Sequence, residues 1–538
     1  MPSPVMGHRP VVILNDDKQT GRPMKGIDLR TNDRSMVLES APGQRLRRVG
    51  NQVYVMSALP TPFNSPVTSF SPVFRELPFR PASRFTGRRV HFVGIGGAGM
   101  SGLARMLKDC GAIVSGSDSQ TNSQTIALSK LGVRISRDQH GQYLDKTVDL
   151  VVRSAAVKDD HFEIRAARAM GIRTVKYAQL LGEVMQERLG IAVAGTHGKS
   201  TTTAMTAYAL LRCGLEPSFV IGGTVPQLGG VGSRSGTGES FVAEACEYDR
   251  SFHNLHPTVA VITNIEEDHL DCYGGIDDIV ESFQTFAGLL PGNGILIANG
   301  QDTNVQRVLR QTDCQVQTVS MGKPAVWSVS PRGIVNGCYQ GEVTLHGRAM
   351  AWLKLSVPGE HNLMNATMAL AAAHSAGADI ESAASAISEF RGVDRRMTYL
   401  GQYAGAHVVD DYGHHPTEIR KTLQALRERY TPRRLICVFQ PHQHSRTRHL
   451  LEDFASSFAL ADQIIMPDIY FVRDSEEERR RVSACDLVRL INQRGQSARH
   501  IPAFDQIVDH LRREVREGDL VVTMGAGNVN EIAIDLVS

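Results

Sequence analysis

Residues 191–214 read IAVAGTHGKSTTTAMTAYALLRCG, and this stretch decides the fold class. An apolar strand leads into the loop GTHGKST at 195–201, and a helical pattern follows the loop. The backbone amides of such a loop cradle phosphates, Lys199 places a cation on them, and the Ser200 hydroxyl can bind Mg²⁺. The general pattern requires glycine where this chain has Val193, so the loop is shorter than in most nucleotide triphosphatases. The stretch therefore predicts a nucleotide site at the end of a buried strand.

Strands alternate with helices on both sides of this loop. Upstream, residues 89–118 read as strand, glycine turn, helix and second strand. Downstream come buried strands at 259–266 and 294–300, a hairpin-like patch from about 326 to 357, and a third alternating series from about 395. Such alternation predicts an α/β fold whose parallel sheets are covered by helices on both faces. We expect three α/β domains, at 89–190, 191–392 and 393–538.

Residues 1–88 differ in composition from the rest of the chain. They hold 11 of the 23 prolines, and 13 Lys+Arg against 6 Asp+Glu give them a charge of 13 − 6 = +7. Because the whole chain carries +2, the other 450 residues sum to 2 − 7 = −5. A segment rich in Pro, Ser and Arg buries too little apolar surface to offset its ordering entropy, so we expect a disordered extension. An interaction arm, a targeting segment and a dispensable extension all stay open for it.

The overall composition excludes several classes of protein. A length of 538 residues predicts several folded units, and 42% hydrophobic with 21% charged residues is ordinary globular usage. The balanced charge gives no reason to expect nucleic acid as a partner. No apolar run is long enough for a membrane span, and no signal peptide pattern precedes residue 90. The eight cysteines form no CxxC pair, so we expect reduced thiols and a cytoplasmic location.

A second glycine loop, GIGGAGMSG, occupies residues 94–102. Its Gly94, Gly96 and Gly99 fit the G-x-G-x-x-G pattern, and Asp118 stands where such folds hold a ribose hydroxyl. Alone, the loop indicates a nicotinamide or flavin enzyme. Two phosphate-binding loops in separate domains argue against a dehydrogenase, which needs only one dinucleotide. They favour two phosphorylated ligands, and if one of them is ATP, a nucleotide-linked substrate is a candidate for the other.

Carboxylates and an imidazole follow two further strands in the domain that carries the phosphate loop. The stretch VAEACEYDRSF places Glu244 and Glu247 at a strand end, and VITNIEEDHLD places four polar residues after another: Asn264, Glu266, Asp268 and His269. Strand-end carboxylates with a neutral imidazole are suitable ligands for the divalent ions that phosphoryl transfer needs. The sequence therefore predicts a metal site beside the phosphate loop.

Read in order, eight motifs make the chain resemble the Mur ligase family: GIGGAGMSG, GTHGKST, EACEYD, TNIEEDHLD, PGEHNLMNA, FRGVDRRM, DDYGHHPTEI and FQPHQHSRT. The resemblance runs from about Arg89 to the C-terminus. Within the family, the chain most resembles the branch that adds L-alanine. It implies a Rossmann-like N-terminal domain for a UDP-sugar, a central P-loop ATPase domain and a Rossmann-like C-terminal domain that closes over the amino acid. The expected cofactors are ATP and two Mg²⁺ ions, with Mn²⁺ as a substitute. The expected form is a monomer or homodimer without nucleic acid or membrane insertion.

The resemblance also implies a reaction. ATP phosphorylates the lactyl carboxylate of UDP-N-acetylmuramate, and the amine of L-alanine attacks the resulting acyl phosphate. A carboxylate is a poor electrophile whereas an acyl phosphate has a good leaving group, so splitting the reaction lowers each barrier. The substrates expected from the resemblance are therefore UDP-N-acetylmuramate and L-alanine.

Residue roles follow from the motif positions in the same resemblance. Catalytic roles fall on Lys199, His269, His415 and Arg446. ATP binding is expected of Gly195, Thr196, His197, Gly198, Lys199, Ser200, Thr201, His361, Asn362, Asn365 and Arg396. UDP-sugar binding is expected of Gly94, Gly96, Gly97, Gly99, Met100, Ser101, Ser117, Asp118, Ser154 and Ala155. Amino-acid binding is expected of Tyr412, His414, His442 and Arg446, and metal binding of Ser200, Glu244 and His269.

The chain departs from the family pattern in three places. It reads HQHSRT at 442–447 where relatives read HRYTRT, and EACEYD where they often read EADESD. No lysine occurs between Lys199 and Lys323, so the carbamylated lysine of related ligases has no counterpart. Three alternatives stay open: a recycling ligase that attaches an intact peptide, a dinucleotide-dependent oxidoreductase, and an ATP-binding scaffold whose catalytic site has decayed.

Overall fold

The computed structural model describes residues 37–39, 44–49, 52–57 and 83–538. In the first three ranges, β1 (Val37–Glu39), β2 (Gln44–Val49) and β3 (Gln52–Ser57) form a small antiparallel sheet of their own. We expected a disordered extension, but its described ranges form three short strands. The other residues of the extension up to residue 82 lie outside the described residues. Phe85 is buried among apolar side chains of the next unit, so folded structure starts before Arg89.

The N-terminal domain is built on a parallel sheet of five strands in the order β6-β5-β4-β7-β8. Its strands are β4 (Arg89–Val93), β5 (Ile113–Ser117), β6 (Arg134–Ser136), β7 (Leu150–Arg153) and β8 (Arg173–Lys176), and its helices are α1 (Ala98–Asp109), α2 (Ser123–Lys130), α3 (Phe162–Ala169) and α4 (Tyr177–Met185). The strand order reverses between β4 and β7, and ligands bind at such a switch point. The second glycine loop follows β4, so the topology places it there.

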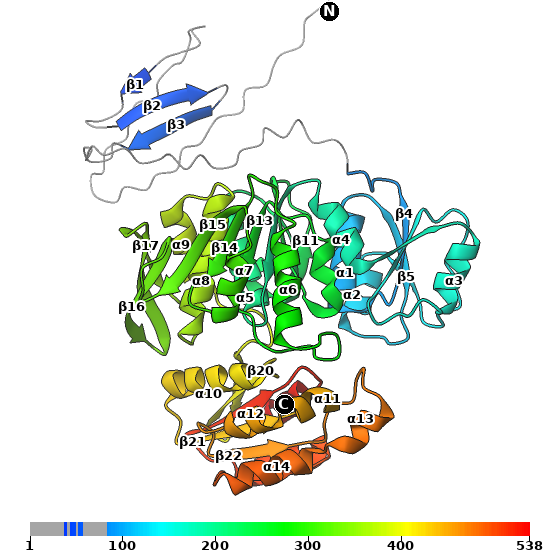
Figure 1. The fold of residues 1–538 in the computed structure, drawn as a ribbon, viewed down its shortest axis with the longest axis vertical. Coiled ribbons are helices and arrows are strands. Elements are labelled where there is room, and N and C mark those ends of the chain that lie inside the picture. Colours follow the sequence, from blue (N-terminus) through cyan, green and yellow to red (C-terminus); the bar gives the residue numbers. More distant parts are fainter. Residues whose placement is uncertain (1–36, 40–43, 50–51, 58–82) are drawn as a thin grey trace, which may run out of the picture. The chain divides into compact units, whose positions relative to one another are not determined.

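The central domain holds a mixed sheet of ten strands in the order β11-β10-β12-β9-β13-β14-β15-β16-β17-β18 (Figure 1). Its strands are β9 (Leu189–Ala194), β10 (Ser218–Val225), β11 (Val231–Arg234), β12 (Ser240–Glu244), β13 (Val259–Ile262), β14 (Ile295–Asn299), β15 (Gln315–Met321), β16 (Trp327–Val335), β17 (Cys338–Leu345) and β18 (Arg348–Lys354). Its helices are α5 (Lys199–Arg212), η1 (Pro226–Leu228), η2 (Tyr248–Asn254), α6 (Ile276–Ala287), α7 (Thr303–Leu309), α8 (His361–Ser375) and α9 (Ile380–Ser388). The antiparallel β16–β18 confirm the predicted hairpin-like patch.

The C-terminal domain has a six-stranded sheet in the order β19-β20-β24-β21-β22-β23, parallel except for β19. The strands are β19 (Thr398–Tyr403), β20 (Ala406–Asp411), β21 (Arg434–Phe439), β22 (Gln463–Met466), β23 (Ala498–His500) and β24 (Asp519–Met524). The helices are α10 (Pro416–Tyr430), α11 (His444–His449), α12 (Leu451–Ser456), α13 (Glu476–Arg481), α14 (Ala484–Gln493), α15 (Phe504–Glu514) and α16 (Asn530–Val537).

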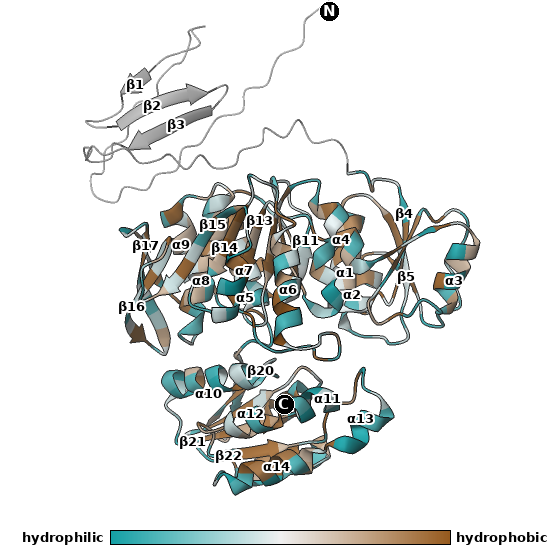
Figure 2. Cartoon of the chain, in the orientation of Figure 1, coloured by the Kyte–Doolittle hydropathy of each residue, from teal (hydrophilic) through white to brown (hydrophobic). Residues whose placement is uncertain are grey.

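The core follows the sequence pattern closely. Parallel strands covered on both faces are apolar along their length, and all four residues of β13 are buried. Helix α8 is buried along almost its whole length, and its run of alanines lets it pack closely on α5. Figure 2 shows brown strands such as β13 and β22 and a teal, exposed helix α13. Among the described residues, no helix is both long enough and apolar enough to cross a membrane.

A short linker joins the central and C-terminal domains. The backbone amide of Asp394 donates to the Thr224 carbonyl at 2.9 Å, and the Thr224 hydroxyl donates to the Asp394 carboxylate. The next residue, Arg395, has a left-handed φ of 62° and donates to the Asp410 carboxylate at 3.1 Å, and its guanidinium also reaches the carbonyls of Gly525 and Gly527. Asp394 is therefore attached to the central domain and Arg395 to the C-terminal domain.

Candidate functional site

The phosphate loop lies between β9 and the first turn of α5, as the sequence predicts. Gly195 and Gly198 have φ values of 135° and 81°, which side chains rarely tolerate. A Cβ atom on Gly198 would lie 2.6 Å from Oδ1 of Asn365, so helix α8 closes one side of the loop. The free amides at the start of α5 point out of the helix, and they form an anion-binding end.

The ammonium of Lys199 lies inside this loop. Its Nζ donates to the carbonyls of Gly195 and Thr196, at 2.5 and 3.1 Å, and to Oε1 of Glu247 at 2.8 Å. Burial disfavours the charged form, but the Glu247 carboxylate outweighs it and raises the pKa of Lys199 above its usual value. The residue is therefore a fixed cation at the place where phosphate oxygens are expected.

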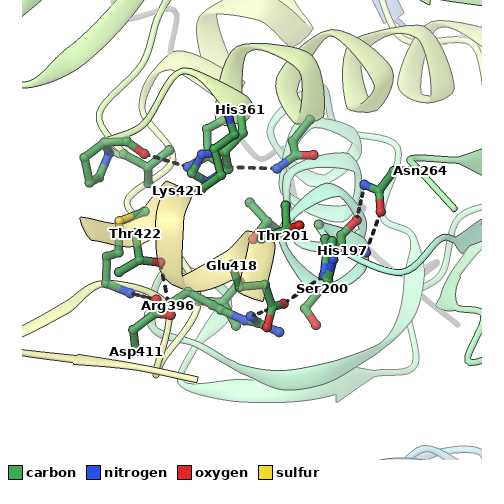
Figure 3. A pocket seen from close by; sticks show the side chains of 18 of the residues that line it. His197, Ser200, Thr201, Asn264, His361, Arg396, Asp411, Glu418, Lys421 and Thr422 are labelled. Carbon is green, nitrogen blue, oxygen red and sulfur yellow. Dashed lines mark hydrogen bonds and ion pairs between the residues drawn. The ribbon is translucent and has the colours of Figure 1, made fainter. Parts of the chain in front are cut away.

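A cavity of about 360 Å³ opens beside the loop (Figure 3). It brings together predicted ATP-binding residues from distant segments: His197, Gly198, Ser200, Thr201, His361, Asn362, Asn365 and Arg396. Asn362 donates to the Pro358 carbonyl at 2.7 Å, and Asn365 donates to Oδ1 of Asn362 at 3.0 Å, so both amides are held at the start of α8. Burial lowers the pKa of His361 to about 4, and this imidazole is neutral at pH 7. The cavity is large enough to hold part of a nucleotide.

His197 stands at the centre of a charged cluster on the wall of this cavity. Its Nδ1 lies 3.2 Å from Oε1 of Glu418 and its Nε2 lies 3.6 Å from Oε2 of Glu266. Burial opposes the charge on His197, but the two carboxylates outweigh burial and raise its pKa to about 9. Figure 3 shows Glu418 between His197 and Arg396, whose Nη1 is 3.6 Å from the same carboxylate. Since Glu418 belongs to α10, the cluster joins the two domains.

His197, Glu266 and His415 offer ligand atoms within 4.8 Å of one another, the closest such grouping in the part of the chain that the structure describes. Two imidazoles and a carboxylate are a donor set that transition metals accept. In the structure, however, His197 is the charged partner of two carboxylates, so the grouping is an ion-pair cluster. The metal ligands predicted from the sequence are three other residues: Ser200, Glu244 and His269.

The predicted metal ligands border the other side of Lys199. Glu244 ends β12, and its Oε2 accepts from the Gly222 amide at 2.9 Å. His269 has a left-handed φ of 53°, and its Nε2 lies 3.8 Å from Oε1 of Glu247. Oε2 of Glu247 is buried without a hydrogen-bond partner in the structure. An orphaned carboxylate oxygen, a second carboxylate and a hydroxyl fit Mg²⁺, which binds through one or two carboxylates and takes its other ligands from phosphates and water.

The predicted amino-acid end of the site faces this region from the C-terminal domain. Nε and Nη2 of Arg446 donate to Oδ1 of Asp268 at 2.9 and 2.5 Å, and both side chains are more than 90% buried. Burial raises the pKa of Asp268, but Arg446 outweighs burial and holds that pKa well below its usual range. Nη1 of Arg446 lies 3.1 Å from Nδ1 of His442, and Nη2 lies 3.5 Å from Nδ1 of His269.

Two neutral imidazoles complete this end. Burial lowers the pKa of His442 to about 2 and that of His414 to about 4, and the two rings lie 5.9 Å apart. Tyr470 stacks on His442 with ring centres 5.6 Å apart. Tyr412 packs edge-on against His414 and under the guanidinium of Arg396, 5.2 Å away. The predicted amino-acid residues therefore gather in one place.

His415, for which a catalytic role is expected, has contacts at both of its ring nitrogens. Its Nδ1 accepts from the Thr417 amide at 3.3 Å as the N-cap of α10, and its Nε2 donates to the Glu267 carbonyl at 3.1 Å. Both ring nitrogens are thus engaged with backbone groups. Burial, with the positive charge of His197, lowers the pKa of His415. In this geometry the residue holds α10 against the central domain, and its expected catalytic role stays a prediction.

The second glycine loop is built as predicted at the β4–β7 switch point. Gly94 has a φ of 79°, and a Cβ there would lie 2.9 Å from Oγ of Ser154. The Gly96 amide donates to Oδ2 of Asp118 at 2.8 Å, which fixes this carboxylate at the mouth of the loop. A Cβ at Gly99 would lie 2.9 Å from the Tyr177 ring. These glycines serve close packing as well as ligand approach.

Other residues expected to bind the UDP-sugar differ in their accessibility. Gly97 and Ala155 are exposed, whereas Met100 and Ser101 are buried in α1. The Ser117 hydroxyl is fully buried and donates to the Glu163 carboxylate, so its side chain faces the core. Its carbonyl accepts from the amides that begin the glycine loop. Ser117 therefore supports the loop and does not line the site.

Four charged side chains that line the cavity were not predicted from the sequence: Glu418, Lys421, Asp302 and Asp411. Glu418 and Lys421 lie on α10, where their spacing is that of an ordinary exposed helix face, and only tertiary contact reveals their position. Asp411 could have been identified from the sequence, because it is the last residue of a buried strand and strand-end carboxylates are frequent ligand contacts. It accepts from the Gly413 and Met397 amides, both at 2.8 Å.

Three family descriptions match the chain in succession. Residues 89–189 match "Mur ligase family, catalytic domain", residues 193–373 match "Mur ligase middle domain" and residues 395–527 match "Mur ligase, glutamate ligase domain". A UDP-N-acetylmuramate–L-alanine ligase of Caldanaerobacter subterraneus subsp. tengcongensis is 42% identical over 83% of this chain and 96% of its own length. The ligase of the same name from Acetivibrio thermocellus is 40% identical, over 83% and 94%.

Solved structures agree with these matches. The UDP-N-acetylmuramate–alanine ligase of Thermotoga maritima superposes with a TM-score of 0.71 at 27% identity, covering 84% of this chain and 98% of that one. A murein peptide ligase of Psychrobacter arcticus covers the same shares with a TM-score of 0.63, also at 27% identity. With three ordered domain matches, relatives at 40% identity over nearly their whole length and the predicted loops in place, the chain belongs to the Mur ligase family.

Proposed function

We propose that this protein joins L-alanine to the lactyl carboxylate of UDP-N-acetylmuramate at the expense of ATP, giving UDP-N-acetylmuramoyl-L-alanine, ADP and phosphate for peptidoglycan synthesis. One observation carries the proposal. The buried Arg446–Asp268 pair brings the residues expected to hold an amino acid beside His269 and Glu247, and Glu247 in turn binds Lys199 of the phosphate loop. The residues expected to bind the amino acid therefore lie next to the residues expected to act in phosphoryl transfer.

Lys199 performs the electrostatic part of the first step. Phosphoryl transfer spreads negative charge over the equatorial oxygens, and a preorganised cation stabilises that charge without reorganisation. Because Lys199 is held by two carbonyls and Glu247, it is in place before the substrates arrive. Mg²⁺, held by Ser200, Glu244 and His269, would screen the phosphate oxygens when bound. We include two such ions in the proposal.

Arg446 and the two neutral imidazoles perform the second step. The guanidinium can grip the alanine carboxylate with two parallel hydrogen bonds, which orients the amine toward the acyl phosphate. The amine must lose a proton as it attacks, and His414, whose pKa of about 4 leaves it neutral at pH 7, is able to accept one. Closure of the C-terminal domain excludes water, which would otherwise hydrolyse the acyl phosphate.

The remaining expectations belong to the same proposal. They are domain boundaries near 190 and 393, a cytoplasmic location where ATP and the UDP-sugar are available, and a monomer or homodimer. The uridine end is assigned to Asp118 and the glycine loop at 94–102, and the adenine end to His361, Asn362 and Arg396.

The direct test is an acceptor assay. Purified protein with ATP and Mg²⁺ should release phosphate only when both UDP-N-acetylmuramate and L-alanine are present. Phosphate release without the amino acid, or none with both substrates at any Mg²⁺ concentration, would contradict the proposal.

A second candidate is attachment of an intact peptide to the same nucleotide. It is favoured by the likeness to the murein peptide ligase of Psychrobacter arcticus. Running the assay with L-alanine and with a tripeptide that begins with L-alanine separates the two, since a peptide ligase would prefer the tripeptide by at least tenfold in kcat/KM.

A further inference from the structure

A cysteine, a histidine and an aspartate line up on the surface of the C-terminal domain, on three elements the proposed reaction does not use. Sγ of Cys485 lies 3.2 Å from Nδ1 of His500, and Nε2 of His500 lies 2.8 Å from Oδ1 of Asp468. Cys485 is the second residue of α14, His500 ends β23, and Asp468 follows β22. The three residues are therefore brought together only by the fold.

The order of contacts is that of an activated nucleophile. A nucleophile within hydrogen-bond reach of a base, with the base oriented by a third group, is the arrangement that activates thiols and hydroxyls. A carboxylate at Nε2 fixes the proton on that nitrogen and leaves Nδ1 facing the sulfur. Cys485 lies in the first turn of α14, two residues after the capping residue Ser483, so its Sγ is held in place beside the ring of His500.

The site is open to a small reactant. Of the eight cysteines, all of them in the described region, only Cys246 and Cys485 are exposed, while Cys437 of the same domain is fully buried. Cys246 lies in the EACEYD segment beside Lys199 and has no histidine–aspartate pair. Burial and Glu247 raise its pKa to about 12, so it serves as a slow reference thiol and the His500→Gln variant carries the comparison. The described residues around Cys485 hold no third metal ligand within range, which argues against a metal.

We propose that Cys485 is an oxidation site for hydroperoxides, with His500 as its base and proton donor and Asp468 as the residue that orients His500. The thiol proton passes to Nδ1 of His500. The sulfur then attacks one peroxide oxygen, an S–O bond forms and the O–O bond breaks. Sulfur loses two electrons, and the leaving oxide takes the proton from His500 to become water or an alcohol. The product is a sulfenic acid at Cys485, which a thiol reductant reverses.

The proposal is tested by trapping the product on the full-length protein. Reduced protein is treated with a fivefold excess of hydrogen peroxide in the presence of dimedone, and the labelled peptides are quantified over time by mass spectrometry. We expect Cys485 to be labelled at least tenfold faster than Cys246. His500→Gln should slow labelling at Cys485 at least tenfold and leave Cys246 unchanged, whereas His140→Gln, at an exposed histidine of another domain, should change neither.

Equal rates at the two cysteines, or an unchanged rate in the His500→Gln variant, would overturn the proposal. If that variant loses its fold, Asp468→Asn provides the same test, because this exposed carboxylate contributes only the orientation of His500. Cys485→Ser should remove the label and keep full ligase activity in untreated protein. The result is independent of the proposed function, since labelling is read without any ligase substrate.

Discussion

Arg446 and Asp268 form a buried ion pair between the C-terminal and central domains, in which Nε and Nη2 of Arg446 both donate to Oδ1 of Asp268. Removing one partner of a buried pair leaves an uncompensated charge, which costs about 3–5 kcal/mol. The pair therefore holds the two domains together and fixes the guanidinium beside His442 and His269.

The first prediction concerns that guanidinium. Arg446→Lys keeps the charge but loses the planar fork, so the KM for L-alanine should rise about tenfold or more while the KM for ATP changes less than about threefold. Steady-state kinetics with each substrate varied gives both values. Arg448→Lys is the matched control, since Arg448 pairs with Glu478 at the surface and should behave like the parent. An equal rise in both KM values would mean that Arg446 acts on domain closure alone.

The second prediction concerns Lys199. Lys199→Ala removes the fixed cation of the phosphate loop, so turnover should fall by about 10³-fold or more, in the range known for electrostatic groups at a transferring phosphoryl. Phosphate release measures it, and circular dichroism checks the fold. Lys323→Ala, at an exposed turn, should retain full activity. Activity within tenfold of the parent would refute the role assigned to Lys199.

The third prediction compares alanine substitutions at two glycines, one where only the backbone would be strained and one where the new Cβ would also collide with a neighbouring side chain. Gly198 and Gly214 both have left-handed φ values, 81° and 74°, but a Cβ at Gly214 meets nothing within 4 Å. Gly214→Ala should therefore cost only about 1 kcal/mol of stability, with ATP affinity unchanged. Gly198→Ala should weaken ATP binding at least tenfold because its Cβ pushes Asn365 out of place. Titration calorimetry and thermal melting distinguish the two, and equal ATP affinities would contradict the geometry.

The fourth prediction is a pH dependence of stability. The pKa of His197 is raised from 6.5 to about 9 by Glu266 and Glu418, with His415 as its other titratable neighbour. A raised pKa stabilises the fold fully below about pH 6.5, and the stabilisation is lost as the pH rises through about 9. The stability difference between the parent and His197→Gln should therefore shrink by up to about 3 kcal/mol between pH 6.5 and 10.

Urea unfolding at fixed ionic strength measures that difference. His140→Gln provides the control for replacing a histidine by glutamine, since His140 is exposed and lies in another domain. A His197→Gln difference that is constant from pH 6.5 to 10 would show that the charge on His197 contributes nothing to the fold.

The fifth prediction concerns the divalent ion. EDTA should abolish phosphate release without changing the circular dichroism spectrum, because the carboxylates that face the site do not hold the core together. Glu244→Gln should raise the Mg²⁺ concentration for half-maximal activity by about tenfold or more, since a neutral amide is a weaker ligand. Glu239→Gln, at the exposed residue just before the same strand, should leave that Mg²⁺ concentration unchanged. Equal Mg²⁺ requirements in the two variants would remove Glu244 from the site.

Elements with strong local signals could be predicted from the sequence. Helix α10 (Pro416–Tyr430) in the third alternating series has such signals, because proline at its first position and a capping box between His415 and Glu418 fix its start. The segment from His449 to Asp462 lacks them. The structure ends α11 at His449 and gives only α12 (Leu451–Ser456) beyond it, because local signals do not fix these breaks.

The candidate site divides in the same way. The glycines and the lysine of the phosphate loop could be identified from the sequence, because their positions depend on residues close to them in the chain. The contact between Arg446 and Asp268 spans 178 residues, and that between Glu418 and His197 spans 221, so no periodicity reveals them. The contact of His415 with the Glu267 carbonyl could not be predicted for the same reason, because Glu267 belongs to another domain.

The linker between Asp394 and Arg395 has a mechanical consequence. With Asp394 attached to Thr224 and Arg395 to Asp410, the ψ of the first residue and the φ of the second are the torsions about which the C-terminal domain can turn. That φ is already in the left-handed region, where the allowed range for a side-chain-bearing residue is narrow. A rotation of the C-terminal domain about these two torsions would therefore be narrowly limited, and it would displace Arg396, the next residue along, which lines the cavity beside the phosphate loop.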